Sequence, residues 1–176
     1  VGVFTMQYDR NIDAPYVYTA PEVSFQGSVS GKIRFALRTL GGRGLKQAFS
    51  RTLQEFRPDV VHLHNIHSYL SPVMAQWAHR YGCRVVWTLH DYKLLCPSYS
   101  CLNHGKACEK CFDAKWHVMA ERCFKNSLLP SMLSWIEAKK WNRKWIEKNV
   151  DAFICPSEFM RRQMLKGHFD ENKLHV

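Results

Sequence analysis

A histidine and a carboxylate, His90 and Asp91, directly follow the apolar segment Arg84–Leu89 in the stretch VVWTLHDYKLLCPSYSC. Imidazole and carboxylate side chains transfer protons, and a carboxylate next to a histidine can orient its ring. Polar residues also follow two other apolar segments, namely His64-Asn65 and Pro156-Ser157. These three positions are the first candidates for a binding or catalytic site.

Five of the seven cysteines fall within 28 residues: Cys96, Cys101, Cys108, Cys111 and Cys123. The CxxC pair at 108 and 111 offers two thiolates from one turn, and a second pair would complete a tetrahedral zinc site. We expect structural zinc at Cys96, Cys108, Cys111 and Cys123, with Cys101 as a spare. The alternatives are reduced thiols and disulfides, and residues 1–7 lack the secretory signal that would favour disulfides.

The sequence HLHNIH places His62 and His64 two residues apart, so on a strand both would project to the same face. Paired histidines can bind one metal ion, but a binuclear hydrolase would need an acidic residue where Ile66 stands. We therefore expect His62 to pack or hydrogen-bond inside a sheet, while His64 and Asn65 reach a ligand.

Four short apolar runs predict strands, at Val1–Gln7, Asp59–His64, Arg84–Leu89 and Asp151–Cys155. The last three are almost continuously apolar, which is typical of parallel strands covered on both faces. Helical periodicity occurs over 45–56 and 70–81, and Ser157 is a natural N-cap for a helix over Glu158–Lys166. Residues 8–31 show no clear period and are expected to form a long loop.

Alternating strands and helices predict a Rossmann-like α/β fold, with a parallel sheet and helices on both faces. Ligands of such sheets bind outside the carboxyl ends of the strands. His64, His90 and Ser157 would all lie at that edge.

The composition is that of one globular domain: 176 residues, 46% of them hydrophobic. Lysine and arginine number 25 against 15 acidic residues, and this net charge of +10 favours an anionic partner. No apolar run is long enough to span a bilayer. The chain begins without Met and stops at the strand-like KLHV, so we expect a fragment of a longer protein.

A basic helix is expected over about 127–148, with Leu129, Met132, Leu133, Ile136 and Lys140 on one face. Its second half, AKKWNRKWIEK, combines five basic residues with Trp141 and Trp145, a mixture that suits an anionic membrane interface. An ordinary helix that faces the core and has a solvated basic back is the alternative.

The chain resembles the amino-terminal domain of a family 4 glycosyltransferase, one half of the two-domain GT-B fold. The matching segments cover most of the chain from about residue 45: FRPDVVHLHNIHSYLSP (56–72), VVWTLHDYKLLCPSY (85–99), CEKC (108–111), RCFKNS (122–127) and DAFICPSEFMRRQML (151–165). The glycine-rich loop that follows the family's first strand is missing, so residues 1–7 resemble the second strand of the fold.

The resemblance implies sugar transfer from a nucleotide-sugar donor with retained anomeric configuration and no catalytic metal. A histidine at the position of His90 would sit beside the transferred sugar, with Asp91 orienting it or accepting a proton. The acceptor, a sugar or a lipid-linked sugar, would contact His64, Asn65, Tyr92, Lys93, Tyr99, Ser157 and Glu158. The donor would bind mainly to a carboxyl-terminal domain absent here, so the fragment would fold without turning over.

The resemblance also implies bacterial cell-surface polysaccharide or glycolipid biosynthesis, in the cytoplasm or peripherally on the inner face of the plasma membrane. The alternative is a zinc-containing nucleic-acid-binding module, which the basic charge and the CxxC pair would suit. Because the basic residues are spread along the chain, we do not expect a nucleic-acid partner.

Overall fold

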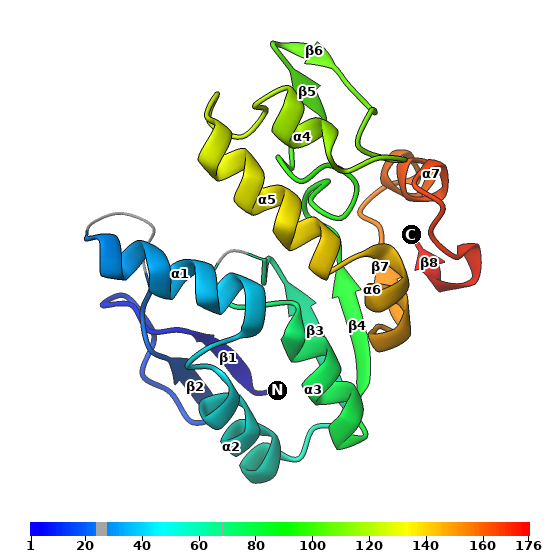
Figure 1. Ribbon diagram of the computed structural model, residues 1–176. Coiled ribbons are helices and arrows are strands. Elements are labelled where there is room, and N and C mark those ends of the chain that lie inside the picture. The colour runs from blue at the N-terminus through cyan, green and yellow to red at the C-terminus, as the bar shows by residue number, and fades with distance from the viewer. Residues whose placement is uncertain (24–27, 68) are drawn as a thin grey trace. The chain divides into compact units, whose positions relative to one another are not determined.

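The computed structural model describes residues 1–23, 28–67 and 69–176, which form two compact units, Val1–Val85 and Val86–Val176 (Figure 1). The boundary falls within strand β4 (Arg84–Thr88). The main sheet has four strands in the order β3-β4-β7-β8, and β7 pairs in parallel with both β4 and β8. This confirms the predicted parallel α/β fold.

The first unit opens with two parallel strands, β1 (Val3–Met6) and β2 (Val17–Ala20), paired in register over four residues. The expectation of a loop over 8–31 was therefore wrong at β2 and at the start of helix α1 (Val29–Gly41), which Ser28 caps. A four-residue strand is stabilised by pairing with its neighbour, and a local sequence window contains no signal of that pairing. The part of the expected loop at 24–27 lies outside the described residues.

Helices α2 (Lys46–Phe56) and α3 (Val73–Tyr81) follow the predicted periodic segments. The chain packs closely where α1 ends, because a Cβ at Gly42 would lie 2.6 Å from a methyl carbon of Val73. Gly42 also has a φ of +65°, so both the backbone and the space favour glycine.

Strand β3 (Val60–His64) departs from the expected pattern of two covered faces. Leu63 is buried, whereas Val60, His62 and His64 are exposed. The prediction that His62 lies inside the sheet was therefore wrong. Because strand side chains alternate, the apolar residues Val61 and Leu63 point to the face opposite the two histidines.

The second unit contains the end of β4, from Val86, together with β7 (Ala152–Ile154) and β8 (Leu174–His175). The strand expected at KLHV is confirmed as β8, and the N–H of Cys155 donates to the carbonyl of His175 at 2.7 Å. Helix α7 (Glu158–Lys166) has the predicted bounds, with the hydroxyl of Ser157 accepting from the N–H of Met160 at 3.2 Å.

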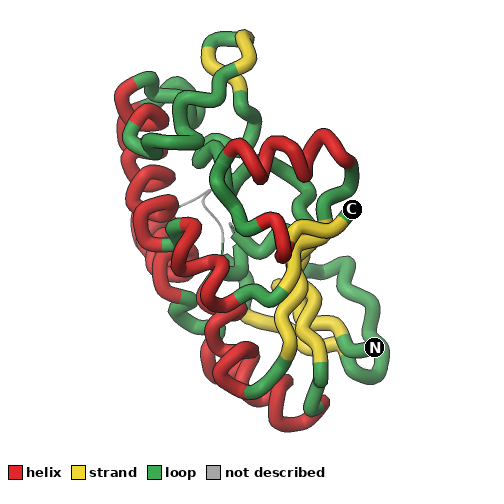
Figure 2. The backbone as a smooth tube through the Cα atoms, turned by 90° about the vertical axis from the view of Figure 1, so that its right-hand side faces the viewer, coloured by secondary structure: helices red, strands yellow, loops and turns green. Residues whose placement is uncertain are grey.

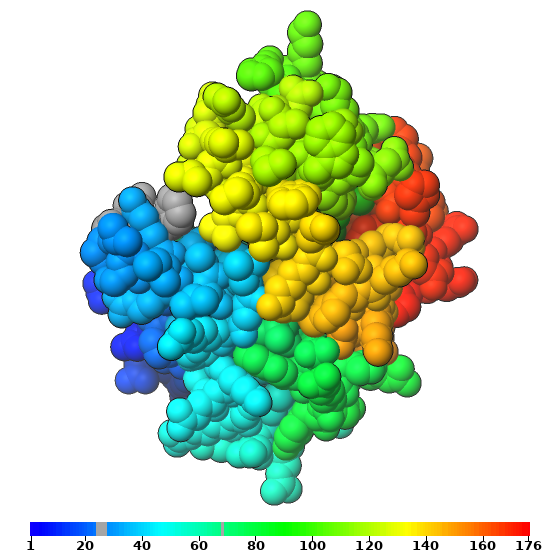
Figure 3. Space-filling view, viewed as in Figure 1, coloured from blue at the N-terminus to red at the C-terminus, as the bar shows by residue number. Residues whose placement is uncertain are grey.

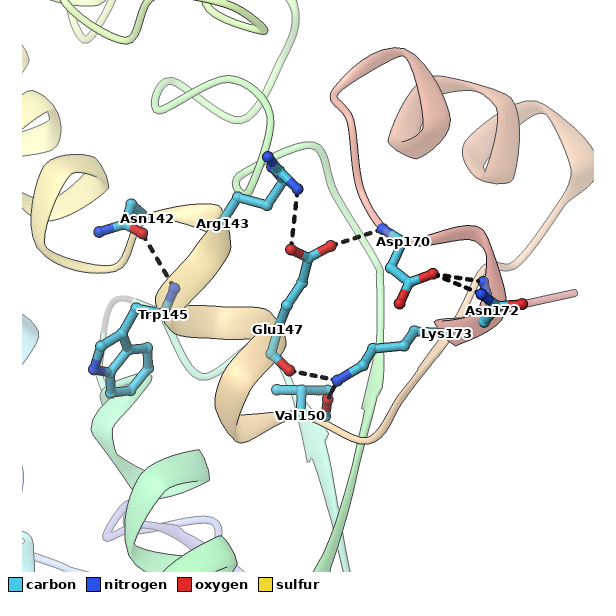
Figure 4. Close-up of polar contacts among 8 residues, drawn as sticks. All are labelled: Asn142, Arg143, Trp145, Glu147, Val150, Asp170, Asn172 and Lys173. Atoms are coloured by element: carbon cyan, nitrogen blue, oxygen red, sulfur yellow. Dashed lines mark hydrogen bonds and ion pairs between the residues drawn. The ribbon is translucent and has the colours of Figure 1, made fainter.

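A polar network fixes β8 to helix α6 (Arg143–Asn149) (Figure 4). Lys173, at the end of the 3₁₀ turn η1 (Glu171–Lys173), donates to the carbonyls of Glu147 and Val150. The Glu147 carboxylate in turn accepts from the N–H of Asp170 at 2.7 Å. These bonds satisfy carbonyls at the end of α6 that have no helical partner.

The single basic helix expected over about 127–148 is two helices, α5 (Leu128–Lys140) and α6. The break lies at Trp141-Asn142, where the Asn142 side chain accepts from the N–H of Trp145 at 3.1 Å (Figure 4). Asparagine is a strong N-cap, so it starts a new helix here. None of the helices in the described residues is long and apolar enough to cross a membrane.

The cysteine segment, residues 96–123, contains little regular structure. It holds the antiparallel hairpin of β5 (Leu102–Asn103) and β6 (Lys106–Ala107), and the one-turn helix α4 (His117–Ala120). The hairpin projects from the rest of this unit, as the small strand pair in Figure 2 shows.

Candidate active site

His90 stands where β4 leaves the sheet. Thr88 pairs with Ile154 of β7, and the N–H of the intervening Leu89 donates to the carbonyl of Ile154 at 3.0 Å. The chain positions that follow, His90 after β4 and Ser157 after β7, therefore share one edge of the sheet. The His90 side chain is exposed at this edge, where ligands of parallel sheets bind.

Asp91 folds the loop after β4 back on itself. Its Oδ1 accepts from the N–H of Lys93 at 2.8 Å, the hydrogen bond of an Asx turn. The carbonyl of Tyr92 then accepts from Leu95 at 2.8 Å and from Cys96 at 2.7 Å. The loop is thus a closed, hydrogen-bonded structure in which one oxygen of Asp91 is already bound.

Lys93 is a buried anchor of this loop. Its ammonium lies 3.0 Å from the Oε2 atom of Glu137 on α5, donates to the carbonyl of Pro97 at 2.8 Å, and stands over the Phe124 ring at 5.6 Å. An ammonium committed to these partners has little capacity for a substrate. The structure therefore does not support the predicted contact between Lys93 and the acceptor.

Glu137 is the residue that sequence analysis missed. It is 6% exposed, and burial raises the pKa of its carboxyl, while the charge of Lys93 opposes that shift and the charge of Asp91 adds to it. A glutamate among the exposed apolar residues of α5 carries no local signal of burial. Its role depends on Lys93, a residue 44 positions away in sequence.

A second lysine, Lys115, fixes the far side of the loop. Its ammonium donates to the carbonyls of Leu94 and Leu95, and burial lowers its pKa to about 8. Leu95 is fully buried against the end of α7, where a Cβ on Gly167 would lie 2.2 Å from its Cδ2. Packing and charge thus hold the loop after His90 from two directions.

Three of the other predicted acceptor residues of this unit, Tyr99, Ser157 and Glu158, are exposed. Tyr99 is 52% exposed and its ring meets Phe124 edge-on at 6.0 Å between centroids. Ser157 and Glu158 open α7, and the Ser157 hydroxyl is already used as the helix cap. Tyr92 is half-buried beside Asp91.

His64 and Asn65 belong to the first unit, at the end of β3. The rings of His62 and His64 lie 4.1 Å apart between centroids, so the two histidines do share a face, as their spacing predicts. Asn65 has a φ of 47°, a left-handed conformation that asparagine tolerates and that turns the chain sharply after the strand.

The predicted zinc ligands lie in one segment but differ in exposure. Cys96 and Cys111 are buried, and Cys101, Cys108 and Cys123 are half-buried. All seven cysteines are free thiols. Within residues 1–23, 28–67 and 69–176, no group of three or more His, Cys, Asp or Glu side chains is arranged, as it stands, to hold a metal ion.

A four-stranded parallel sheet flanked by helices defines a Rossmann-like α/β protein. Residues 1–176 match Glycosyltransferase Family 4 along their whole length, and the chain belongs to this family. Family membership also confirms the resemblance found in the sequence.

The chain is also similar to a protein of Klebsiella pneumoniae described as an uncharacterized 42.6 kDa protein in the cps region. The two are 26% identical over 140 residues, which is 78% of this chain and 31% of that protein. The chain thus spans about a third of the length of the curated relative it matches. No solved structure matches the chain.

Proposed function

We propose that this chain is the acceptor-side half of a retaining glycosyltransferase that uses a nucleotide-sugar donor in bacterial cell-surface polysaccharide or glycolipid biosynthesis. The observation that carries the proposal is His90, exposed at the carboxyl end of β4 in a chain of family 4. The relative from a cps region supports the polysaccharide assignment. Family membership favours this function over a nucleic-acid-binding module.

The chemistry of glycosyl transfer explains why His90 is suited to this position. The reaction needs an acceptor hydroxyl held in line with the anomeric carbon and donors that stabilise the leaving diphosphate. An imidazole at a strand end can hydrogen-bond a sugar hydroxyl or the diphosphate side. In this proposal His90 acts at the reacting sugar, and no metal takes part.

We assign Asp91 a role that depends on the position of its carboxylate. With Oδ1 bound to the N–H of Lys93, the carboxylate is held in one orientation beside His90. Such a carboxylate can orient the imidazole or accept the proton of the acceptor hydroxyl. Fixing the group in advance lowers the entropic cost of reaching the transition state.

The acceptor contacts in this unit are Tyr92, Tyr99, Ser157 and Glu158. Tyr99 offers an exposed aromatic face against which a sugar ring can pack, and Glu158 accepts hydrogen bonds from sugar hydroxyls. The contact of His64 and Asn65 with the acceptor stays a prediction from the sequence. The donor is bound mainly by a second domain, so residues 1–176 alone are inactive in this proposal.

A peripheral membrane location suits a lipid-linked acceptor. Helix α5 exposes four apolar side chains, those of Leu128, Leu129, Met132 and Ile136. Two basic residues, Lys139 and Lys140, end the helix. The outer surface of α5 is seen in yellow in Figure 3. Apolar side chains beside basic ones bind the interface of an anionic bilayer.

Of the two tryptophans that the sequence suggested for the membrane contact, Trp145 is half-buried and Trp141 is not available at the surface. Trp141 is buried, and its ring lies 4.6 Å from that of Trp145 between centroids. The proposed membrane contact is therefore the exposed apolar face of α5, in the first half of the expected helix.

The proposal is tested on the full-length protein with a panel of nucleotide sugars and polyprenyl-linked sugar acceptors. We expect release of a nucleoside diphosphate that depends on the acceptor. The reaction should proceed without added divalent cation. Nuclear magnetic resonance of the fresh product should show that the transferred sugar keeps the anomeric configuration that it had in the donor. Product of inverted configuration would disprove the retaining mechanism. No transfer from any donor, together with salt-sensitive binding to DNA or RNA, would instead support the nucleic-acid-binding alternative.

A further inference from the structure

Helix α1 (blue in Figure 1) has the reverse of the usual arrangement of side chains for a helix at a protein surface. Arg38 and Thr39 are each 3% exposed, whereas Val29, Ile33 and Leu37 are 73%, 55% and 38% exposed. A usual surface helix turns its apolar side to the core. The three exposed apolar residues are spaced by four, so they form one continuous stripe along the helix. We call them the α1 stripe.

The inner side of α1 is held in place by polar contacts. Arg38 donates from Nη1 to the carbonyl of Pro21 at 2.6 Å and from Nε to the carbonyl of Arg43 at 3.2 Å. The hydroxyl of Ser71 donates to the carbonyl of Thr39 at 3.2 Å. A rotation of the helix that buried the α1 stripe would break these hydrogen bonds, and buried polar groups without partners are costly. The stripe therefore faces outward because the opposite side of the helix is already committed.

Basic residues border the α1 stripe on both sides. Lys32 and Arg34 are exposed and are the sequence neighbours of Ile33. Because an α-helix turns by about 100° per residue, they lie on opposite sides of the stripe. The sequence around them, residues 23–54, contains no acidic residue and six basic ones: Lys32, Arg34, Arg38, Arg43, Lys46 and Arg51. The stripe is thus an apolar surface with a positively charged border.

We propose that α1 binds the interface of an anionic lipid bilayer. The α1 stripe enters the region where headgroups meet acyl chains, and the charged ends of Lys32 and Arg34 stay at the level of the lipid phosphates. An apolar stripe between basic residues is the arrangement found in helices that lie in the plane of a membrane. This contact goes beyond the one proposed for α5, because it belongs to the first unit and rests on different residues.

The charged border favours a bilayer over other partners. If the stripes of two copies of this chain packed together, the basic residues beside them would also come close together, and like charges oppose association. A nucleic acid would pair with the basic side chains but would leave the stripe in water. An anionic bilayer offers phosphates to Lys32 and Arg34 and acyl chains to the stripe, so it matches both features.

The first experiment measures how the full-length protein sediments with vesicles of phosphatidylglycerol and phosphatidylcholine. We expect Ile33→Glu to weaken binding about fivefold or more, because it places a carboxylate in the middle of the stripe. The matched control is Val60→Glu, which replaces a 53% exposed valine of the same unit and should bind like wild type. Wild-type binding by Ile33→Glu, or an equal loss in Val60→Glu, would overturn the proposal.

The second experiment removes the basic border and leaves the stripe intact. Lys32→Gln/Arg34→Gln should weaken binding to the same vesicles about tenfold, because each basic side chain near an anionic surface adds to the attraction. The control Lys106→Gln/Arg162→Gln removes the same charge from exposed positions of the second unit and should change binding little. All four positions are exposed, so these variants should fold even if Ile33→Glu does not. Equal losses in the two double variants would show that net charge alone matters, which would overturn the assignment to α1.

Further variants separate this contact from the other proposals. Leu129→Glu removes the contact proposed for α5, so the double variant Ile33→Glu/Leu129→Glu should bind more weakly than either single variant. Binding that is lost in Leu129→Glu and unchanged in Ile33→Glu would assign the membrane contact to α5 alone and refute this one. Self-association that Ile33→Glu abolishes without changing vesicle binding would make the stripe an interface between two copies, and would also refute it. Vesicle binding requires no sugar transfer, so binding that depends on α1 would support this proposal even if no transferase activity were found.

Discussion

The ammonium of Lys93 lies 3.0 Å from the Oε2 atom of Glu137, and the two side chains are only 10% and 8% exposed. This buried ion pair ties the loop that carries His90 and Asp91 to helix α5. Removing one member of such a pair leaves an uncompensated buried charge, whereas replacing both with apolar residues is often tolerated.

We therefore expect Lys93→Met to lower the free energy of unfolding by about 3–5 kcal/mol in urea denaturation. The double variant Lys93→Met/Glu137→Leu should recover most of that loss. The control is Arg51→Ala, which breaks a surface pair with a 76% exposed arginine and should leave the free energy of unfolding almost unchanged. A loss below about 1 kcal/mol for Lys93→Met would show that the buried pair contributes little.

The raised pKa of Glu137 makes part of the stability depend on pH. A carboxyl with a raised pKa binds its proton more tightly in the folded state, so its contribution is present at low pH and is lost as pH rises through the raised pKa. Glutamine cannot titrate. As the pH falls from about 7 to about 4.5, near the ordinary pKa of a glutamate, the Tm of wild type should therefore rise relative to the Tm of Glu137→Gln. A difference that stays constant would contradict this prediction.

Gly167→Ala should destabilise the protein by about 1–3 kcal/mol, because its Cβ would lie 2.2 Å from the Cδ2 atom of the fully buried Leu95. Gly41→Ala is the matched control, since no atom lies within 4 Å of the Cβ built there. We expect that control to change the free energy of unfolding by less than about 1 kcal/mol. Equal effects of the two substitutions on thermal unfolding would argue against the tight contact.

In the full-length enzyme, His90→Ala should lower kcat by about 10²–10³-fold, by analogy with the loss of one oxyanion-hole donor. An interaction made mainly in the transition state lowers kcat and kcat/KM together, so donor KM should change little. The control is His168→Ala, an exposed histidine that pairs with Asp113 at 3.1 Å. If the folded His90→Ala variant keeps more than about a third of wild-type kcat, His90 has no part in the mechanism. Such a loss is much smaller than the tenfold change in rate that corresponds to about 1.4 kcal/mol.

Binding to acidic vesicles should depend on the exposed face of α5. We expect Leu129→Glu to reduce sedimentation with phosphatidylserine vesicles several-fold, because Leu129 is the most exposed of the apolar side chains of α5, at 71%. Leu102→Glu, which replaces a 49% exposed leucine on the hairpin, should bind like wild type. Binding should weaken above about 0.15 M salt, where the Debye length is roughly 8 Å. Equal binding of both variants, or of neutral and acidic vesicles, would refute this contact.

The sequence was sufficient for the parts of the fold that depend on local pattern. Apolar runs of strand length gave β4 and β7 within two residues, and Ser157 with Gly167 bounded α7 as predicted. Each is a local feature, because hydrophobic period and helix caps are set by residues within a few positions of each other.

The sequence was not sufficient to predict elements whose burial or pairing depends on residues far away in the chain, or a helix whose apolar residues face outward. Helix α5 exposes Leu129 and Met132 and buries Ser131, Ser134 and Glu137, the reverse of a usual amphipathic helix. Glu137 is buried because Lys93 offsets its charge, and β2 forms because β1 is available to pair with it. Neither condition is contained in a local window.

For the candidate site, the sequence determined which residue types stand at the strand ends, because a strand's end and the polar residues after it are adjacent in the chain. It placed His90 and Asp91 after β4 and Ser157 after β7. Only the tertiary structure decided how they are used. It paired Lys93 with Glu137 and fixed Asp91 in a turn, because burial and charge pairing depend on which distant segments pack together.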